Sequence, residues 1–447
     1  MSDGLPQPQR GLALLTICIA IAMSVIDAAV VNVALPTIST DLAVTPAHSI
    51  WVVNAYQLAI TVSLLPLASL GDILSYRTVY RAGIVLFTLA SIACGLSDSL
   101  LTLTLARIAQ GFGAAGVMSV NIALIRAVYP KSLLGVGVGN VAMVVAICSA
   151  AGPSVGAAIL AVAPWRWLFF VNGPLGLIAA VLAFRVLPAT PRLDHKLDAL
   201  SVALNAATFS LLIIGVQGLG SRDMTSALFE LGGAAVAAAL LTWRQFGLPL
   251  PVLPIDLLSR PVFALSMVSS VSSFSAQSLL QIGMPFYLMH GLGFSVARAG
   301  LLMTAFPAAI ALMAPLSGRL ADRFPPGLLG SAGLLAFSAG LVSTALMPSS
   351  PNDFDIAWRL ALCGIGFGFF QSPNNRVLIG SAPPERSGGA AGLQSTGRLV
   401  GQSLGAAVTA VIYARGAAQP LVIAMAIGAA VTFAGALASG LRKVPMV

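Results

Sequence analysis

The chain has 447 residues, of which 58% are hydrophobic and only 8% are charged, and its formal net charge is +9. Soluble domains carry roughly 25% charged residues, so this composition excludes a soluble globular protein. The positive charge does not indicate nucleic-acid binding, because the Lys and Arg residues fall in short segments between apolar runs. The four cysteines lie inside apolar runs at unrelated spacings and indicate neither a disulfide framework nor a metal site.

Long apolar runs recur along the chain and predict an all-α, polytopic membrane protein embedded in a lipid bilayer. An even number of spans places both termini on the same side. If that side is the cytoplasm, its segments hold sixteen Lys and Arg residues against five outside, which predicts cytoplasmic termini. We expect fourteen spans, approximately at residues 11–36, 50–70, 78–97, 100–127, 134–162, 166–187, 199–219, 225–244, 262–288, 296–317, 327–347, 357–379, 389–414 and 418–440.

A short loop pattern occurs once in each half of the chain. The stretch ASLGD at 68–72 follows the second span, and GRLADR at 318–323 follows the tenth. Two parallel halves around a central cavity are a transporter architecture. We therefore expect an N-terminal six-helix bundle at 1–190, an additional helix pair with linkers at 191–260 and a C-terminal six-helix bundle at 261–447.

The first span contains an isolated acid. Asp27 lies in SVIDAAVVNVALP (24–36), with no basic residue between Arg10 and Arg77. An acid at the bilayer centre costs about 2.5–3.5 kcal/mol, so such residues usually face a cavity and have a function. A low dielectric favours the uncharged form of a carboxyl group, whereas a nearby cation opposes this. Proton binding is therefore one interpretation, and a structural acid paired with Arg107 or bonded to neighbouring helices is the other.

Arg107 is the other charge inside a span of the first half. Its guanidinium cannot practically lose a proton, so it needs partners: helix carbonyls, Gln110 or Asp27. If the two charges approach each other, protonation of Asp27 would break an ion pair and leave Arg107 free to reorganise. That would couple a proton to a conformational change. The alternative is a helix-packing arginine that never changes its partner.

Polar side chains within the other spans are candidate substrate contacts, although hydrogen bonds between helices would explain any single one equally well. Spans 9 to 14 contain no acid near their middle, so a neutral or monocationic substrate fits better than a dication. An anionic substrate is left open by the two embedded arginines, one of which could instead cap a helix. The candidates are Asn54, Gln57, Gln277, Gln281, Gln371, Asn374, Asn375 and Arg398.

Several stretches of the sequence resemble motifs of the major facilitator superfamily and, within it, of the fourteen-helix drug:proton antiporter branch. IDAAVVNVALP is similar to the branch signature of span 1, GRLADR to the family's loop motif and LTLARIAQGFGAAG to its embedded-arginine motif. The stretches DGLPQPQR, SIWVVNAYQ and FGFFQSPNNR are similar to the YebQ-like transporters of bacteria.

The resemblance implies roles for particular residues. Asp27 would be the proton acceptor, coupled to Arg107. The loop residues would gate the cytoplasmic side, and four residues of span 5 would form a rigid, tightly packed antiporter-motif helix. The loop residues are Asp72, Arg77, Asp322 and Arg323, and the span 5 residues are Gly139, Gly152, Pro153 and Gly156.

The sequence therefore predicts a proton-coupled exporter of small amphipathic organic compounds, including drugs and dyes, in a bacterial cytoplasmic membrane. The alternative is a dedicated metabolite exporter, or a facilitator that uses no protons. The chain contains no G-x-x-x-x-G-K-[ST] loop for ATP, so the proton gradient would supply the energy without a cofactor. It contains no H-E-x-x-H, acid cluster or nucleophile motif, so we do not expect an enzyme. A monomer would suffice for this mechanism.

Overall fold

The computed structural model describes residues 4–192, 197–220, 224–246, 255–321, 323–382 and 387–442, and over these ranges it is all-helical. Proline sets many of the helix boundaries, because its fixed backbone angle suits the first turn. Three of the long helices carry it there, at Pro261, Pro326 and Pro420. Side chains cap others: Ser99 and Thr102 form a capping box before Leu100.

The N-terminal half contains α1 (Gln9–Asp41), α2 (Pro46–Ser49), α3 (Trp51–Leu74), α4 (Tyr76–Gly95), α5 (Leu100–Ser119), α6 (Asn121–Val128), α7 (Leu134–Val162), α8 (Trp167–Phe170) and α9 (Asn172–Val186). The additional pair is α10 (Ala199–Gly218) and α11 (Met224–Phe246). The C-terminal half contains α12 (Pro261–Phe286), α13 (Val296–Met303), α14 (Ala305–Leu320), α15 (Pro326–Ala345), α16 (Asp353–Gly380), α17 (Ser387–Ala414) and α18 (Pro420–Gly440).

The fourteen predicted spans match these helices closely. Within the described residues, twelve helical segments are long and apolar enough to cross a membrane. The other two are α16 and α17, which have 28 residues each and bring the total to fourteen. In the fold, α16 contacts α14 and α15, and α17 contacts α12 and α3.

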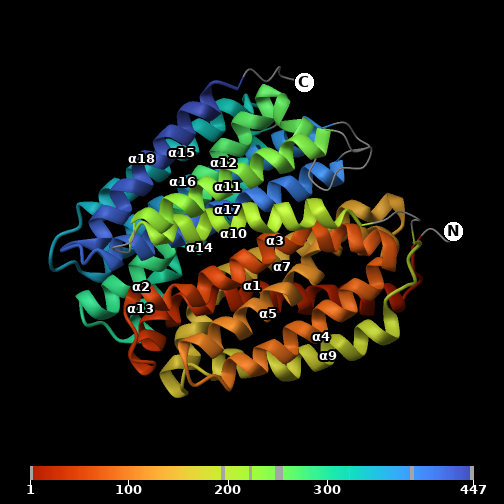
Figure 1. Ribbon diagram of the computed structural model, residues 1–447, viewed down its shortest axis with the longest axis horizontal. Helices are drawn as coiled ribbons and strands as arrows, with labels where there is room; N and C mark the ends of the chain where they lie inside the picture. The colour runs from red at the N-terminus through yellow and green to blue at the C-terminus, as the bar shows by residue number, and fades with distance from the viewer. Residues whose placement is uncertain are drawn as a thin grey trace.

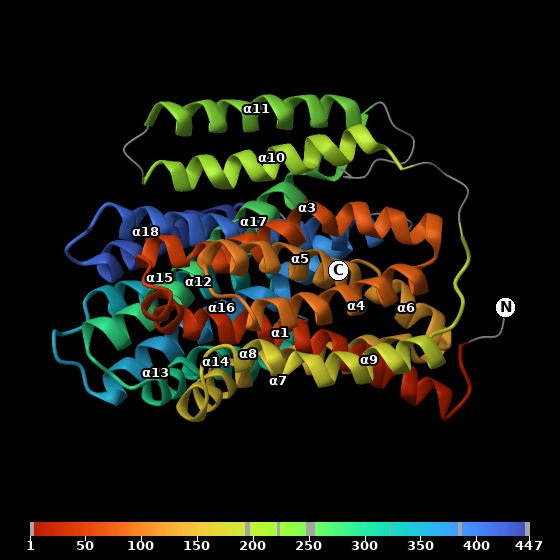
Figure 2. The same cartoon turned by 60° about the horizontal axis from the view of Figure 1, so that its bottom comes forward.

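The helices of the two halves lie side by side, roughly parallel to the long axis of the molecule (Figure 1). The additional pair lies outside them, with α10 against the body and α11 beyond it (Figure 2). Because α10 contacts both α3 and α17, it lies along a seam between the halves. The domain boundaries near 190 and 260 stay predictions.

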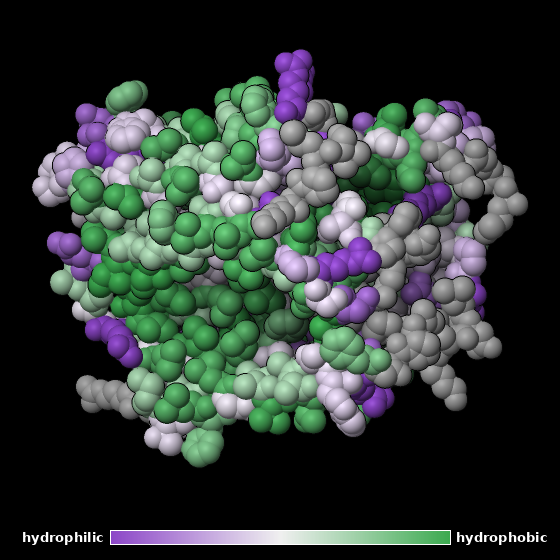
Figure 3. Space-filling model, turned by 90° about the horizontal axis from the view of Figure 1, so that it is seen from above, coloured by the Kyte–Doolittle hydropathy of each residue, from purple (hydrophilic) through white to green (hydrophobic). Residues whose placement is uncertain are grey.

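Hydrophobic side chains cover most of the surface seen in Figure 3, and hydrophilic ones gather mainly toward the helix ends. On α11, Phe229 is 77% and Trp243 79% exposed. Such exposure is unfavourable in water and is expected for helices that face lipid. A buried apolar cluster joins the halves near the end of α1. It brings Ile38 of α1 and Val53 of α3 together with Phe286 of α12 and Ala410 of α17.

Candidate functional site

The two embedded charges of the first half form an ion pair. The Arg107 Nη1 atom of α5 donates to the Asp27 Oδ2 atom of α1 at 2.5 Å, and neither side chain is more than 1% exposed. Removing two charges from water is costly, and their attraction repays this only with good geometry and further hydrogen bonds. The surroundings of the pair supply those bonds.

Amide groups satisfy the second oxygen of the carboxylate. Asp27 Oδ1 accepts from Gln110 Nε2 at 2.8 Å and from Asn172 Nδ2 at 3.2 Å. The Gln110 amide also donates to Ser91 Oγ at 2.7 Å. The carboxylate therefore ties α1 to α5 and α9, and through Gln110 to α4. All three groups that face the carboxylate, on Arg107, Gln110 and Asn172, are N–H donors.

Arg107 has partners besides the carboxylate. Its Nε atom donates to the Val52 carbonyl oxygen at 3.0 Å, and Nη1 also donates to Gln110 Oε1 at 2.6 Å. Its guanidinium carbon lies 4.0 Å from the centre of the Tyr56 ring, which adds a cation–π contact. All three kinds of partner expected from the sequence, a carbonyl, Gln110 and Asp27, are thus present together.

Each half contains an equivalent close contact between two of its helices. A Cβ atom on Gly111 of α5 would lie 2.6 Å from the Tyr56 carbonyl oxygen of α3. In the C-terminal half, a Cβ atom on Gly364 of α16 would lie 2.2 Å from the Phe306 carbonyl oxygen of α14. Only glycine permits such approaches. The contacts therefore align α16 with α5 and α14 with α3.

The C-terminal half replaces the charges with apolar groups. Leu360 is equivalent to Arg107, because each lies four residues before the glycine of its close contact, Gly364 or Gly111. Ala276 is equivalent to Asp27, because each lies nine residues before the proline inside its helix, Pro285 or Pro36. Both belong to one buried hydrophobic cluster that also holds Phe306. Among the described residues, the ionic network thus belongs to the N-terminal half.

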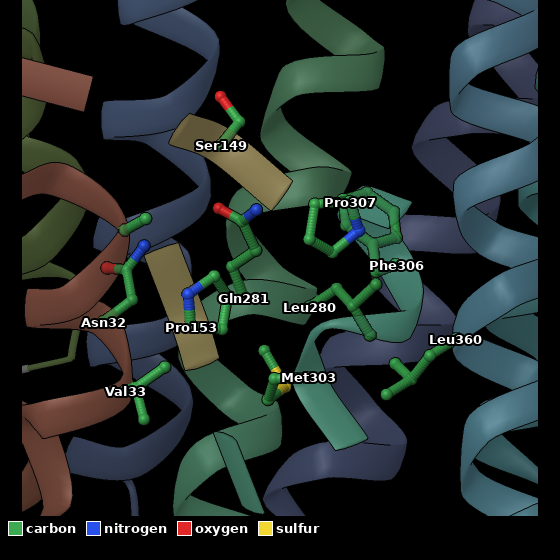
Figure 4. Close-up of a pocket in the computed structure, with 11 residues that line it drawn as sticks. Asn32, Val33, Ser149, Pro153, Leu280, Gln281, Met303, Phe306, Pro307 and Leu360 are labelled. Carbon is green, nitrogen blue, oxygen red and sulfur yellow. The ribbon is translucent and has the colours of Figure 1, made fainter. Parts of the chain in front are cut away.

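A cavity lies between the halves (Figure 4). The amides of Asn32 and Gln281 and the hydroxyl of Ser149 lie on one side of it, and the apolar side chains lie largely on the other. The described residues that line it carry no charge. They are Ala29, Asn32 and Val33 of α1, Ser149 and Pro153 of α7, Leu280 and Gln281 of α12, Met303 of α13, Phe306 and Pro307 of α14, and Leu360 of α16.

Helix α1 connects the ion pair with the cavity. Ala29, Asn32 and Val33 line the cavity, and they lie about 140° to 240° around the helix axis from Asp27. The carboxylate therefore faces the interior of the N-terminal half, while the opposite face of the same helix meets the cavity. Any rearrangement around Asp27 that turns or shifts α1 also changes the cavity wall.

The glycines of the fifth span differ in their surroundings. A Cβ atom on Gly152 would lie 2.4 Å from the Ala29 Cβ atom, and one on Gly156 would lie 3.1 Å from the Val30 Cβ atom. Among the described residues, no atom beyond the neighbouring backbone of its own helix lies within 4 Å of the corresponding position on Gly139. Of these three glycines, Gly152 and Gly156 therefore permit close packing of α7 on α1, and Gly139 takes no part in it.

The same helix also contacts the C-terminal half. A Cβ atom on Gly300 of α13 would lie 2.2 Å from the Ala157 Cβ atom and 2.9 Å from the Pro153 carbonyl oxygen. Nearby, the hydroxyl groups of Ser154 and Thr304 share a hydrogen bond of 2.6 Å. This second seam between the halves is closed in the present structure.

The loop residues lie at helix ends. Asp72 is half-buried near the end of α3 and accepts from the Tyr76 hydroxyl at 2.5 Å. Arg77 is half-buried in the first turn of α4, and Arg323 is exposed after α14. Asp322 lies outside the described residues. A gating role for these four residues stays a prediction.

Three of the seven candidate amides have hydrogen-bond partners on other segments. Asn54 Nδ2 donates to Gln217 Oε1 of α10 at 3.4 Å. Asn374 Oδ1 accepts from Arg442 Nη1 at 2.7 Å. Asn375 Oδ1 accepts from Gln394 Nε2 at 2.6 Å.

The remaining candidates lie inside the bundles, and one of them lines the cavity. The Oε1 atoms of Gln57 and Gln277 are buried without a hydrogen-bond partner among the described residues. Gln371 and Arg398 are half-buried. Gln281 alone of the eight candidates lies among the described lining residues.

Several members of the site were not predicted. Asn172, Ser91 and Tyr56 complete the ionic network, and Asn32 lines the cavity beside Gln281. Asn32 and Asn172 both stand in motifs that the sequence displays, VVNVALP and FFVNGP. The sequence signal that could have identified Asn32 and Asn172 was therefore a polar residue inside an otherwise apolar motif.

Comparison with known proteins places the chain in a family. Its sequence matches the model of the Major Facilitator Superfamily over residues 17–406 and again over 266–445. It is 50% identical over 444 residues to the uncharacterized transporter YebQ of Escherichia coli (strain K12), an alignment that covers 99% of this chain and 97% of YebQ.

Two more distant relatives have names that state a substrate or a resistance role. The riboflavin transporter RibZ of Clostridioides difficile (strain 630) is 28% identical over 410 residues, with 91% of this chain and 89% of RibZ covered. The multidrug resistance protein Stp of Mycobacterium tuberculosis (strain CDC 1551 / Oshkosh) is 30% identical over 403 residues, with 89% and 74% covered.

The fold is also that of a solved transporter. The crystal structure of a bacterial homologue of the human lysosomal transporter Spinster, in an inward-facing and unoccupied conformation, aligns with a TM-score of 0.71. The two share 17% sequence identity, and the alignment covers 97% of this chain and 98% of the other, so the likeness concerns the fold alone. The chain is a multi-pass membrane protein that belongs to the Major Facilitator Superfamily, a family of transporters rather than enzymes.

Proposed function

We propose that the protein is a proton-coupled antiporter of the fourteen-helix drug:proton branch, which exports small amphipathic organic compounds by alternating access. It would lie in the bacterial inner membrane with both termini in the cytoplasm, as the distribution of Lys and Arg suggests. The observation that carries the proposal is the buried ion pair of Asp27 and Arg107, on a helix that also lines the cavity.

Proton binding would disturb this network directly. The carboxylate of Asp27 accepts from Arg107, Gln110 and Asn172. A protonated carboxyl group presents an O–H donor, and at least one of these N–H donors then has to turn away or flip. Arg107 would keep the Val52 carbonyl and the Tyr56 ring as partners. Protonation would thus release α1 from α5 or α9, and Arg107 would lose its counter-ion while these two contacts remain.

The released helix would transmit the change to the substrate. Because α1 carries Asp27 on one face and cavity residues on the other, its movement alters the wall that holds the substrate. Entry of a proton from outside, after substrate has left, would return the protein to the inward-facing state. This is population shift by a ligand, here a proton, that binds one state more tightly.

The uncharged cavity wall supports a neutral or weakly charged amphipathic substrate. One chain supplies the ion pair, the cavity and both contacts between the halves, at α10 and between α7 and α13. This supports a functional monomer. A second candidate function is export of one metabolite, which the neutral amides in the cavity and the named substrate of RibZ favour.

The test is substrate-induced proton release from sealed, everted vesicles with an acidic interior, followed by a pH-sensitive dye. Lipophilic cations and neutral drugs are added to vesicles that contain the native protein, Asp27→Asn or Asp98→Asn. Asp98 is the matched control, because its side chain is 93% exposed. We expect proton release with the native protein and the control, and none with Asp27→Asn although it still binds the compound.

Transport of a compound by the native protein without proton release would contradict antiport and favour a facilitator. Normal proton release by Asp27→Asn would remove this residue from the coupling mechanism.

A further inference from the structure

We propose that Asn32 and Gln281 together recognise an uncharged substrate group in which a hydrogen-bond donor stands beside a carbonyl, as in an amide or imide edge. The inference rests on the proposed transport function and narrows its substrate class. Asn32 projects from the N-terminal half and Gln281 from the C-terminal half, and both line the cavity (Figure 4).

The first observation is an unpaired acceptor. Asn32 is only 9% exposed, and its Oδ1 atom is buried without a hydrogen-bond partner among the described residues. Buried polar groups in proteins are nearly always paired, and each exception needs an explanation. An N–H or O–H group on a ligand in the cavity would satisfy this oxygen, so the substrate should carry a donor.

The second observation is the matching position of the two amides. Asn32 lies four residues before the proline inside α1, and Gln281 four residues before the proline inside α12. They therefore occupy equivalent places in the two halves. Each carboxamide has one acceptor oxygen and two N–H donors. Asn32 can accept from the substrate while Gln281 donates to its carbonyl, so one bound group would contact both halves at once.

The third observation concerns the rest of the cavity. Opposite the amides lie Leu280, Met303, Phe306 and Leu360, which offer apolar, thioether and aromatic surface. Such groups suit a flat apolar body. Because the described lining residues carry no charge, an ionised group on the substrate would find no counter-ion there. The favoured substrate is therefore an uncharged ring system with an amide or imide edge.

A pair of fluorescent compounds tests the donor specifically. The imide 1,8-naphthalimide and its N-methyl derivative are uncharged and flat, keep the same two carbonyl groups, and differ in the N–H donor. Dissociation constants are measured by fluorescence titration of the purified full-length protein in lipid nanodiscs. No proton gradient is needed, so failure of proton coupling and failure of this inference are distinguishable.

We expect the native protein to bind the N–H compound about tenfold or more tightly than the N-methyl compound, since the latter leaves the Asn32 oxygen unpaired. In Asn32→Leu the N–H compound should lose this advantage, while the N-methyl compound binds no more weakly than before. Gln281→Leu should weaken both compounds alike, because both keep the carbonyl groups. Gln245→Leu is the matched control, as its amide contacts Ser201 within the additional helix pair, and it should preserve the preference.

Equal binding of the two compounds by the native protein would overturn the inference, as would binding of neither. So would an Asn32→Leu protein that binds both compounds equally less well. If Asn32→Leu does not fold, Asn32→Ala replaces it and has to show the same selective loss, because alanine also lacks the acceptor oxygen. Gln281→Leu provides an independent check, because a selective loss of the N–H compound there would contradict the assigned roles.

Discussion

Replacing Asp27 with asparagine should destabilise the protein strongly, and adding Arg107→Gln should restore part of the loss. The single replacement leaves Arg107 as a buried cation without a counter-ion, and it cannot neutralise itself by losing a proton. Removing one partner of a buried ion pair costs about 3–5 kcal/mol, whereas replacing both partners is often nearly neutral.

The structure supplies a second reason for the loss. Asp27 accepts from three N–H donors, on Arg107, Gln110 and Asn172. An asparagine offers one acceptor oxygen and turns an N–H donor toward at least one of these donors. A lost hydrogen bond that leaves a buried group unpaired costs about 1–3 kcal/mol. This cost is already part of the loss of about 3–5 kcal/mol for breaking the ion pair.

The assay is a double-mutant cycle on equilibrium unfolding in detergent, followed by tryptophan fluorescence. We expect the order of stability to be native, then the double variant Asp27→Asn/Arg107→Gln, then Asp27→Asn. The second replacement should recover about 2 kcal/mol or more. Asp98→Asn, at an exposed carboxylate, should match the native protein. Additive losses, with the double variant the least stable, would refute the reasoning that an unpaired cation causes the damage.

Three further outcomes follow from the packing and the surface charges. Gly152→Ala should lower the free energy of unfolding by about 1–3 kcal/mol, because its Cβ would lie 2.4 Å from the Ala29 Cβ atom. Gly139→Ala on the same helix has open space around it and should be neutral or slightly stabilising. Gly300→Ala should separate α13 from α7, which a lower yield of cysteine cross-links between these helices would detect. Hydrogen bonds from Arg244 lower the pKa of Asp198 from 3.8 to about 2, so this pair should stabilise α10 and α11 at any pH above about 4 and lose its effect only as the pH falls toward 2. The stability lost in Asp198→Asn should therefore be the same at pH 5 and pH 8, measured by unfolding at each pH.

The fold was predictable because composition and hydropathy determine which segments a bilayer can hold. Each predicted span matches one helix or two consecutive helices to within a few residues. The span 134–162 matches α7 (Leu134–Val162), and 100–127 matches α5 and α6 together. Asp27 and Arg107 could be singled out because a charge inside a span is rare and expensive. Their contact could not be predicted, since it depends on how α1 and α5 face each other.

The partners of the amides could not be predicted for the same physical reason. An amide inside a span needs a hydrogen-bond partner, but nothing local specifies which helix provides it. Asn54 finds Gln217 at a separation of 163 residues, on a helix that the sequence places outside both bundles. Asn374 finds Arg442 near the end of α18. Such residues stabilise the helix packing, and only the three-dimensional arrangement separates them from Gln281, which faces the cavity.

The comparison of the two halves suggests why one carries the charges and the other does not. Where the N-terminal half places Asp27 and Arg107, the C-terminal half places Ala276 and Leu360 within a continuous apolar cluster. A second ionic network in the same position would place two more charges in the interior of the C-terminal half, and removing them from water on folding costs several kcal/mol. An apolar counterpart avoids that cost and, under the proposed mechanism, leaves one group whose protonation would shift the equilibrium. The halves would then share their backbone geometry, so that they can rock symmetrically, and differ in chemistry, so that a single proton site controls the movement.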